Sequence, residues 1–302
     1  MLADAVADYV AVRRAAGFAC RSEGLLLQSF VRFAAARAES HVRASVAIAW
    51  AGLSRSVPQC ARRLGMVRRL ARYLRAEDAR HEIPAAVFGA EKRSRPVPYI
   101  LSQDQIRQLV AAAWRSGYRT LRRDTYATFF ALLACTGLRV SEAIRLRLDD
   151  ITPDGLVIRC SKFRKSRLVP LHDTARAGIE RYLQRRCRYA PEETHVFVSL
   201  RRKPLLVSDV EVAFRTAARA SGLVDRAGRG RPTPHSLRHS FAVRALQACP
   251  DGRDAITQHM LALSTYLGHA KVADTYWYLE AVPELMADIA ERCEHFVMGG
   301  RS

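Results

Sequence analysis

One stretch of the sequence can form neither a continuous helix nor a strand, and it divides the chain in two. Residues 84–98, PAAVFGAEKRSRPVP, contain three prolines, and each proline restricts its own backbone and that of the residue before it. This pattern predicts an extended linker at residues 86–99. The chain has 302 residues, enough for two domains of about 150 residues, each with a core of its own. We therefore expect domains at residues 1–85 and 100–302.

The first domain shows helical periodicity throughout. Apolar residues recur every three or four positions at Leu64, Val67, Ala71 and Leu74, which predicts the buried stripe of a helix. The other positions of this helix carry six arginines, Arg62, Arg63, Arg68, Arg69, Arg72 and Arg75. Such a face is typical of a helix that lies along DNA, and it is equally typical of a solvated helix surface.

The second domain alternates between helical and strand patterns. It begins with a capping box, in which Ser102 is followed three residues later by Gln105. Two β-type runs, residues 156–160 and 167–171, surround a polar turn and predict a hairpin, and residues 195–199 are a candidate third strand. Helices are expected at residues 125–135, 141–148, 173–187, 208–221, 235–248, 254–266 and 283–297. The predicted fold is mainly α with a small antiparallel sheet, as a helical N-terminal domain followed by a mixed α+β domain.

The charge of the chain points to a polyanionic partner. Lys and Arg number 49 against 29 Asp and Glu, which gives a formal net charge of +20. A basic surface gains free energy when it releases counterions from phosphates, so nucleic acid is the leading candidate. Both domains carry a basic excess, and Lys92, Arg93 and Arg95 add a basic cluster in the linker. The alternative is a GC-rich genome that favours arginine in general.

Several classes of protein are disfavoured. The longest stretch without a charged residue, 255–270, has 16 residues, whereas a membrane-spanning helix needs about 20 apolar ones. Asp4 and Asp8 precede every arginine, which is unlike a signal peptide. The seven cysteines are widely spaced with no C-x-x-C pair, so neither a disulfide framework nor a zinc ribbon is expected. We expect a cytoplasmic, nucleoid-associated protein with no metal, no cofactor and no membrane contact.

Four words in the second domain contain residues that suit a phosphate-handling site. They are ACTGLRVSEAIRL, CSKFRKSRLVPLH, TPHSLRHSFA and YLGHAKVADTYWYL. Cations, imidazoles and a phenol together can neutralise a phosphate and move its protons. The candidate residues are Arg139, Lys162, His235, Arg238, His269 and Tyr278. Each of them alone is more often structural, so their order along the chain carries the argument.

Residues 100–285 resemble the catalytic domain of the tyrosine recombinase (phage integrase) family. That family shows, in this order, a TGLR-[IV]-SE word, a hairpin Lys before R-x-VPL, an H-x-L-R-H word, an LGH word and a nucleophilic Tyr. All five features occur here in the same order. The N-terminal region is similar only in kind, to the small basic core-binding domain with which the family clamps DNA. The resemblance implies a site-specific DNA recombinase of a mobile element, an integrase or transposon recombinase.

The resemblance also implies a role for each candidate. Arg139 and Arg238 would bind the scissile phosphate, and Tyr278 would attack it to form a covalent 3′-phosphotyrosine. Lys162 would act as general acid, with His235 and His269 supporting proton transfer and phosphate contacts. Lys165 is a rival to Lys162, and otherwise a DNA contact, although the distance to R-x-VPL favours Lys162. Tyr266 and Tyr276 are rivals to Tyr278, which the spacing after LGH favours.

Two further features leave alternatives open. Residues 283–298 predict an amphipathic tail helix, which by the resemblance would dock into a neighbouring protomer and assemble a homotetramer on double-stranded DNA with specific recombination sites. Docking on its own domain is the alternative. Glu142 is expected either to orient Arg139 or to support its helix, and burial would favour the first. The rival functions are a type IB topoisomerase-like activity and a catalytically inactive, architectural DNA-binding protein.

Overall fold

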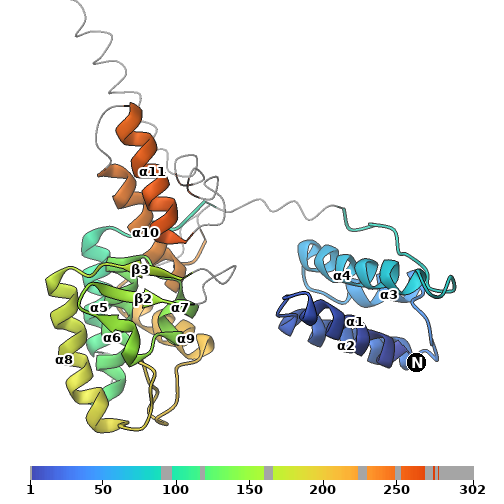
Figure 1. The fold of residues 1–302 in the computed structure, drawn as a ribbon, viewed down its shortest axis with the longest axis horizontal. Coiled ribbons are helices and arrows are strands. Elements are labelled where there is room, and N and C mark those ends of the chain that lie inside the picture. The colour runs from blue at the N-terminus through green and yellow to red at the C-terminus, as the bar shows by residue number, and fades with distance from the viewer. Residues whose placement is uncertain are drawn as a thin grey trace, which may run out of the picture. The chain divides into compact units, whose positions relative to one another are not determined.

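A computed structural model of the chain describes residues 2–89, 97–115, 120–159, 166–223, 230–248 and 253–268, together with Thr275 and Tyr278. The chain divides into two compact units, Met1–Arg95 and Pro96–Ser302 (Figure 1). This division falls inside the stretch expected to be a linker. The basic cluster of Lys92, Arg93 and Arg95 lies outside the described residues.

The N-terminal unit is built from helices. They are α1 (Leu2–Ala15), α2 (Arg21–Ala35), α3 (Ala44–Gly52) and α4 (Val57–Arg75). The apolar stripe predicted on α4 is buried, as expected from its spacing, and it packs with Phe30 and Trp50 from α2 and α3. The rings of Phe30 and Trp50 meet edge to face with their centroids 5.4 Å apart. Aromatic contacts of this kind add to the stabilisation from buried apolar area.

The C-terminal unit combines helices with one small sheet (Figure 1). Its elements are α5 (Gln103–Arg115), α6 (Leu121–Thr136), α7 (Val140–Arg145), a 3-10 turn (Leu148–Asp150), β1 (Ile151–Thr152), β2 (Gly155–Ile158), β3 (Arg167–Val169), α8 (Asp173–Tyr189), α9 (Val207–Ala220), α10 (Pro234–Gln247) and α11 (Arg253–Leu267). The strands are antiparallel in the order β1-β2-β3. The predicted fold class, mainly α with a small antiparallel sheet, is confirmed.

Helix α6 forms the centre of this unit. It packs against α5, α8, α9 and α10, and both Phe129 and Phe130 on it are fully buried. The capping box before α5 is present, because Ser102 N–H donates to Gln105 Oε1 at 3.0 Å and Gln105 N–H donates to Ser102 Oγ at 3.2 Å. Among the described residues, no helix is both long and apolar enough to cross a membrane.

The third strand lies elsewhere than the sequence indicated. β1 at residues 151–152 completes the sheet, while residues 195–199 form only isolated bridges, Arg147 to His195 and Val198 to Pro204. The reason is that fully buried Arg186 on α8 donates to the carbonyls of residues 190, 193, 195 and 196. Within the expected strand, the carbonyls of residues 195 and 196 are therefore taken by a side chain, and the remaining backbone contacts form only the isolated bridges. The apolar residues at 195–199 therefore indicated that this segment is buried, but they did not indicate that it pairs with a strand of the sheet.

Gly137 ends α6 in a conformation that only glycine adopts easily. Its φ is +61°, and a Cβ at this position would lie 2.5 Å from Cδ1 of Phe241 on α10. The left-handed conformation costs a residue with a Cβ roughly 1–2 kcal/mol, and an overpacked contact adds about 1–3 kcal/mol. The junction between α6 and α7 therefore depends on the absence of a side chain here.

We predict that Gly137→Ala lowers the unfolding free energy of the C-terminal unit by about 3 kcal/mol. The matched control is Gly222→Ala after α9, where φ is +72° but a Cβ would meet nothing within 4 Å. It should cost only about 1 kcal/mol, which is the backbone term alone. Urea denaturation followed by circular dichroism measures both variants, and equal losses would contradict the contact with Phe241.

Candidate active site

Arg139 stands at the junction between α6 and α7. It immediately precedes α7, and its backbone N–H donates to Glu142 Oε2 at 3.0 Å while its Nη1 donates to Glu142 Oε1 at 2.7 Å. Its Nη2 donates to the carbonyl of Gly268 at 2.8 Å. The side chain is 24% exposed, so part of it remains open to solvent. The junction thus presents a fixed cation at the surface.

Arg238 lies in the first turns of α10 and is only 2% exposed. Its Nη1 donates to the carbonyl of Gly137 at 2.7 Å, and its Nη2 donates to the carbonyl of Leu267 at 2.8 Å. Burial, and then the charge of Arg139, lower the pKa of Arg238 to about 10. Arg238 therefore remains a cation at neutral pH.

The carboxyl end of α11 binds three guanidinium groups. Arg167 on β3, Arg238 on α10 and Arg139 before α7 each donate to one of three successive carbonyls, those of Tyr266, Leu267 and Gly268. The last carbonyls of a helix lack partners within the helix and carry its negative partial charge. We call these three side chains the arginine cluster. Its three bonds join residues that are 129, 99 and 29 positions apart in the sequence.

Glu142 is the buried anion of this cluster. Arg167 donates to both of its carboxylate oxygens, at 3.1 and 2.8 Å, and Arg139 shares one of them. Burial alone would raise the pKa of Glu142, but the hydrogen bonds and charges of Arg167 and Arg139 outweigh it and lower the pKa to about 2. Because Glu142 is buried and contacts the Arg139 side chain directly, orienting Arg139 is the better of its two expected roles.

Tyr278 and two histidines lie beside the arginine cluster. The Tyr278 side chain is 2% exposed, and its hydroxyl lies 3.1 Å from Nδ1 of His239. The rings of His235 and His239 are 4.4 Å apart. Desolvation of the ring, followed by the charges of Arg238 and Arg139, lowers the pKa of His235 to about 4, although the residue as a whole is exposed. His235 is therefore neutral at pH 7.

Four of the six predicted catalytic residues are described, and the structure brings them together. The charges of Arg139 and Tyr278 both act on Arg238, and those of Arg139 and Arg238 act on His235. Lys162 and His269 lie outside the described residues, as do Lys165 and Tyr276. The other rival, Tyr266, stacks on Phe241 with the ring centroids 5.5 Å apart, and burial raises its pKa to about 12. Tyr266 is thus placed as a core residue.

Sequence reasoning missed two residues of this site. Arg167 served there only as part of the R-x-VPL word, yet its guanidinium contacts Glu142 and the end of α11. His239 appeared there only as the last residue of the H-x-L-R-H word, yet it contacts the Tyr278 hydroxyl. The words R-x-VPL and H-x-L-R-H were therefore the available signals.

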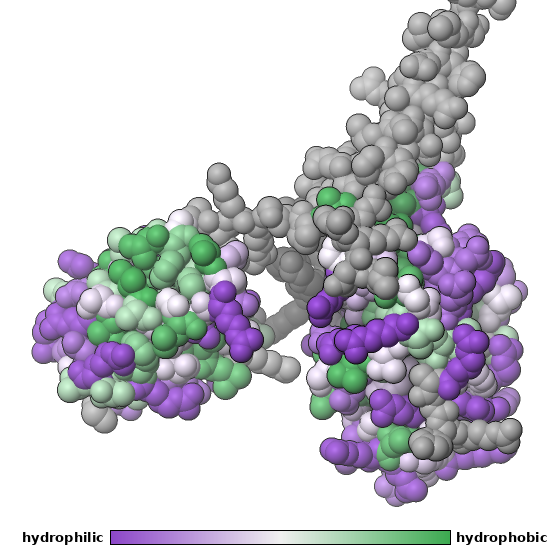
Figure 2. Space-filling model, turned by 180° about the vertical axis from the view of Figure 1, so that it is seen from behind, coloured by the Kyte–Doolittle hydropathy of each residue, from purple (hydrophilic) through white to green (hydrophobic). Residues whose placement is uncertain are grey.

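The arginine face predicted on α4 is present in part. Arg62, Arg69, Arg72 and Arg75 are exposed, whereas Arg63 and Arg68 are half-buried. Two of the six are also engaged within the unit, since the Arg63 guanidinium lies 5.2 Å from the Trp50 ring and Arg69 donates to Glu23 at 3.1 Å. Hydrophilic side chains lie between apolar patches on the face of this unit that Figure 2 shows.

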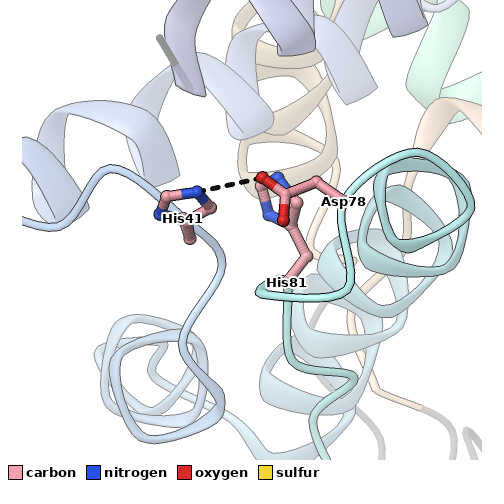
Figure 3. Close-up of side chains that lie close together, drawn as sticks. All are labelled: His41, Asp78 and His81. Carbon is pink, nitrogen blue, oxygen red and sulfur yellow. Dashed lines mark hydrogen bonds and ion pairs between the residues drawn. The ribbon is translucent and has the colours of Figure 1, made fainter.

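A group of potential metal ligands, His41, Asp78 and His81, lies elsewhere in the N-terminal unit (Figure 3). His41 Nε2 is 3.2 Å from Asp78 Oδ2, and Asp78 also accepts from Arg80. The N–H of Val42 donates to His81 Nδ1 at 3.0 Å, so a neutral His81 ring carries its proton on Nε2. Neither ring nitrogen of His81 then offers a lone pair to a cation. We interpret the group as a polar bridge between the loop before α3 and the loop after α4.

We predict that the loss of stability caused by Glu142→Gln depends on pH. A carboxyl whose pKa falls from 4.5 to about 2 on folding stabilises the protein fully above pH 4.5, and this contribution is lost as the pH falls toward 2. The difference in unfolding free energy between the wild type and the variant should therefore shrink by about 2 kcal/mol from pH 5 to pH 3. Urea titrations at several pH values measure it. A difference that is constant over this range would contradict the buried ion pairs.

Comparisons with known proteins agree with this geometry. The phage integrase family model matches residues 100–284. A putative integrase/recombinase of Sinorhizobium fredii, y4rB, is 38% identical over 301 residues, covering 96% of each chain. The tyrosine recombinase XerD of Caulobacter vibrioides is 32% identical over 240 residues, covering 76% of this chain and 73% of its own length.

Solved structures show the same fold. The Tn1549 transposon integrase in complex with transposon right end DNA has a TM-score of 0.64 at 17% identity, covering 96% of this chain and 98% of that one. A lambda integrase dimer bound to a core site has a TM-score of 0.63 at 20% identity, covering 92% and 76%. The family match and the long similarity to curated recombinases together show that this chain belongs to the phage integrase family of tyrosine recombinases.

Proposed function

We propose that this protein is a site-specific DNA recombinase that cuts and rejoins DNA strands through a covalent 3′-phosphotyrosine at Tyr278. The observation that carries the proposal is the pair Arg139 and Arg238, both bound to backbone carbonyls, with Tyr278 near enough to Arg238 for their charges to interact. A carbonyl orients a guanidinium group without cancelling its charge. Glu142 also pairs with Arg139, but it shares its single negative charge with Arg167. Both cations therefore remain able to neutralise a phosphate, and in this scheme no metal is needed.

The two arginines suit the transition state of phosphoryl transfer. A pentacoordinate phosphorus gathers negative charge on its non-bridging oxygens, and planar guanidinium groups can bind such oxygens with two parallel hydrogen bonds. Each guanidinium has five N–H donors, which is more than the contacts that hold Arg139 and Arg238 in the described structure use. Stabilising this charge is worth about 3 kcal/mol or more for each donor group.

The proton transfers can be assigned to side chains. The Tyr278 hydroxyl loses its proton as its oxygen bonds to phosphorus, and His239 Nδ1 at 3.1 Å is placed to accept it. The bond from phosphorus to the 5′ oxygen breaks, and Lys162 supplies the proton that this oxygen needs. Attack by a new 5′ hydroxyl reverses the steps and releases Tyr278. The ester keeps the energy of the broken bond, so rejoining needs no nucleotide.

The basic N-terminal unit and linker are proposed to bind the duplex. The exposed arginines of α4, Arg62, Arg69, Arg72 and Arg75, are the best placed for phosphate contacts. Arg63 and Arg68 are half-buried and contribute less, while Lys92, Arg93, Arg95 and Lys165 are proposed from the sequence alone. The named relatives, putative integrases, and the transposon integrase structure support a mobile element as the setting. The protein would then act in the cytoplasm on DNA of the nucleoid.

The tail at residues 283–298 is proposed to join protomers into a tetramer. It has four acidic side chains against a single arginine, in a chain that is otherwise strongly basic. The C-terminal unit has two adjoining pockets along α5, α6 and α8, which share the apolar residues Val110 and Ala131 and are also lined by Arg115 in one and Arg181 in the other. We call them together the groove. An acidic amphipathic helix complements such a groove in both apolarity and charge. We propose that the tail of a neighbouring protomer occupies it.

Tyr278→Phe should abolish covalent attachment to DNA and leave binding unchanged, because only the attacking oxygen is removed. The probe is a nicked duplex built from the terminal sequences that flank the gene, and the readout is an adduct that survives denaturant. Tyr266→Phe is the matched control and should still form the adduct, since its ring packs on Phe241.

Each rival function gives a different result in this assay. An adduct that persists in Tyr278→Phe but disappears in Tyr276→Phe would move the nucleophile. A purely architectural protein would bind the duplex without any adduct from the wild type. A type IB topoisomerase would relax supercoiled plasmid that lacks the flanking sequence, whereas the proposed recombinase needs paired sites.

Removing residues 283–302 should abolish tetramer assembly on DNA while cleavage by single protomers continues. Ala131→Glu, at an exposed position in the groove, should have the same effect because it places a bulky anion where the acidic tail would dock. Ala220→Glu, on the exposed end of α9, is the control. Sedimentation of protein–DNA complexes gives the stoichiometry, and tetramers formed by the truncated chain would contradict the proposed role of the tail.

A further inference from the structure

Arg167 stands out because the sequence motif that contains it gives it no role, while in the structure all three of its guanidinium nitrogens donate hydrogen bonds to protein atoms. Nε donates to the carbonyl of Tyr266 at 2.7 Å, and Nη1 and Nη2 donate to the two oxygens of Glu142. The side chain is 11% exposed. With its donors directed at protein atoms and little surface left, Arg167 is poorly placed to bind a phosphate itself.

We propose that Arg167 is a positioning residue for DNA cleavage, which holds Glu142 and the end of α11 so that Arg139 presents its charge to the scissile phosphate. This inference rests on the proposed function. Glu142 has one negative charge and two guanidinium partners. The guanidinium of Arg167 binds both carboxylate oxygens, whereas that of Arg139 binds only Oε1, and Oε2 also accepts from the Arg139 backbone N–H. The Arg139 cation is therefore only partly neutralised.

Loss of Arg167 would change Arg139 in two ways. First, Glu142 could turn to bind Arg139 through both oxygens, the preferred geometry of an arginine–carboxylate pair, and would then cancel the charge that the phosphate needs. Second, the Tyr266 carbonyl would lose its partner, which would loosen the end of α11 where the Gly268 carbonyl holds Arg139 Nη2. Both effects reach the phosphate through Arg139.

The close packing at Gly268 supports a shared role for these two arginines. A Cβ on Gly268 would lie 2.9 Å from Arg167 Nη1 and 3.4 Å from Arg139 Nη1. The two guanidinium groups therefore approach the same point on the backbone, which a side chain would block. Arg167 is therefore packed against the same backbone atoms as Arg139, which an isolated ion pair on the surface would not require.

The experiment compares two scissile linkages in a nicked duplex made from the sequences that flank the gene. One is the natural phosphodiester, and the other is a methylphosphonate, which lacks the negative charge that Arg139 would neutralise. Single-turnover cleavage and DNA affinity are measured separately for the wild type, Arg139→Ala, Arg167→Gln and Arg167→Lys.

On the phosphodiester, we expect Arg167→Gln to cleave about 100-fold more slowly than the wild type, in the range seen when one electrostatic donor is removed, with DNA affinity unchanged. On the methylphosphonate, its deficit relative to the wild type should shrink to less than tenfold, in parallel with Arg139→Ala. Arg167→Lys keeps the positive charge but loses the paired N–H donors that bind both oxygens of Glu142. It should therefore recover part of the cleavage rate.

The matched control is Arg176→Gln. Arg176 on α8 also holds backbone carbonyls, those of Thr152 and Pro153, but it does not contact the arginine cluster in the described structure. It should cleave at the wild-type rate on both substrates. If Arg167→Gln does not fold, Arg167→Lys carries the same comparison of substrates.

Two outcomes would overturn the inference while leaving the proposed function intact. Arg167→Gln could cleave the phosphodiester within threefold of the wild type, or its deficit could be equal on the two linkages while that of Arg139→Ala shrinks. The second result would make Arg167 a structural residue only. If the wild type forms no adduct on either duplex, the proposed function itself fails.

Discussion

The arrangement of the candidate site depends on the carboxyl end of α11. Three successive carbonyls there accept hydrogen bonds from arginines of three other segments. These bonds set the positions of the α6–α7 junction, β3 and α10 relative to one another. In these bonds the guanidinium groups are oriented by carbonyl dipoles rather than by anions. Glu142 is the one anion that takes part, and Arg139 and Arg167 share it. A site built in this way keeps an excess of positive charge, and a phosphodiester is the natural ligand for such an excess.

Local patterns were enough to predict most of the fold. The apolar stripe of α4, the capping box before α5 and the strands of the hairpin follow from spacing and residue type, which are local properties of the chain. The third strand was misplaced because residues 195–199 have a strand-like apolar run, but their carbonyls are used by Arg186. A side chain that substitutes for a neighbouring strand leaves no mark in the local pattern.

The residues of the candidate site likewise fall into those that local sequence patterns predict and those that only the tertiary structure reveals. Arg139, His235, Arg238 and Tyr278 could be named as candidates from words in the sequence, because those words include the side chains themselves. Arg167 could not be given a role, since its partners are a backbone carbonyl and a carboxylate shared with Arg139. Backbone acceptors are present at every residue, so which of them meet a given arginine depends on how β3 and α11 pack together, and that is a property of the tertiary structure.

The charge of the cluster links stability to function. Three guanidinium groups lie close to one carboxylate, and the charge of Arg139 adds to burial in lowering the pKa of Arg238, so like-charge repulsion is present in the protein without DNA. Such repulsion lowers the stability of the folded state. A phosphate that enters the cluster offsets it, and the more negative transition state offsets it further. In the proposed reaction, the same unfavourable interaction in the DNA-free protein becomes a preference for the transition state, which is the condition for catalysis.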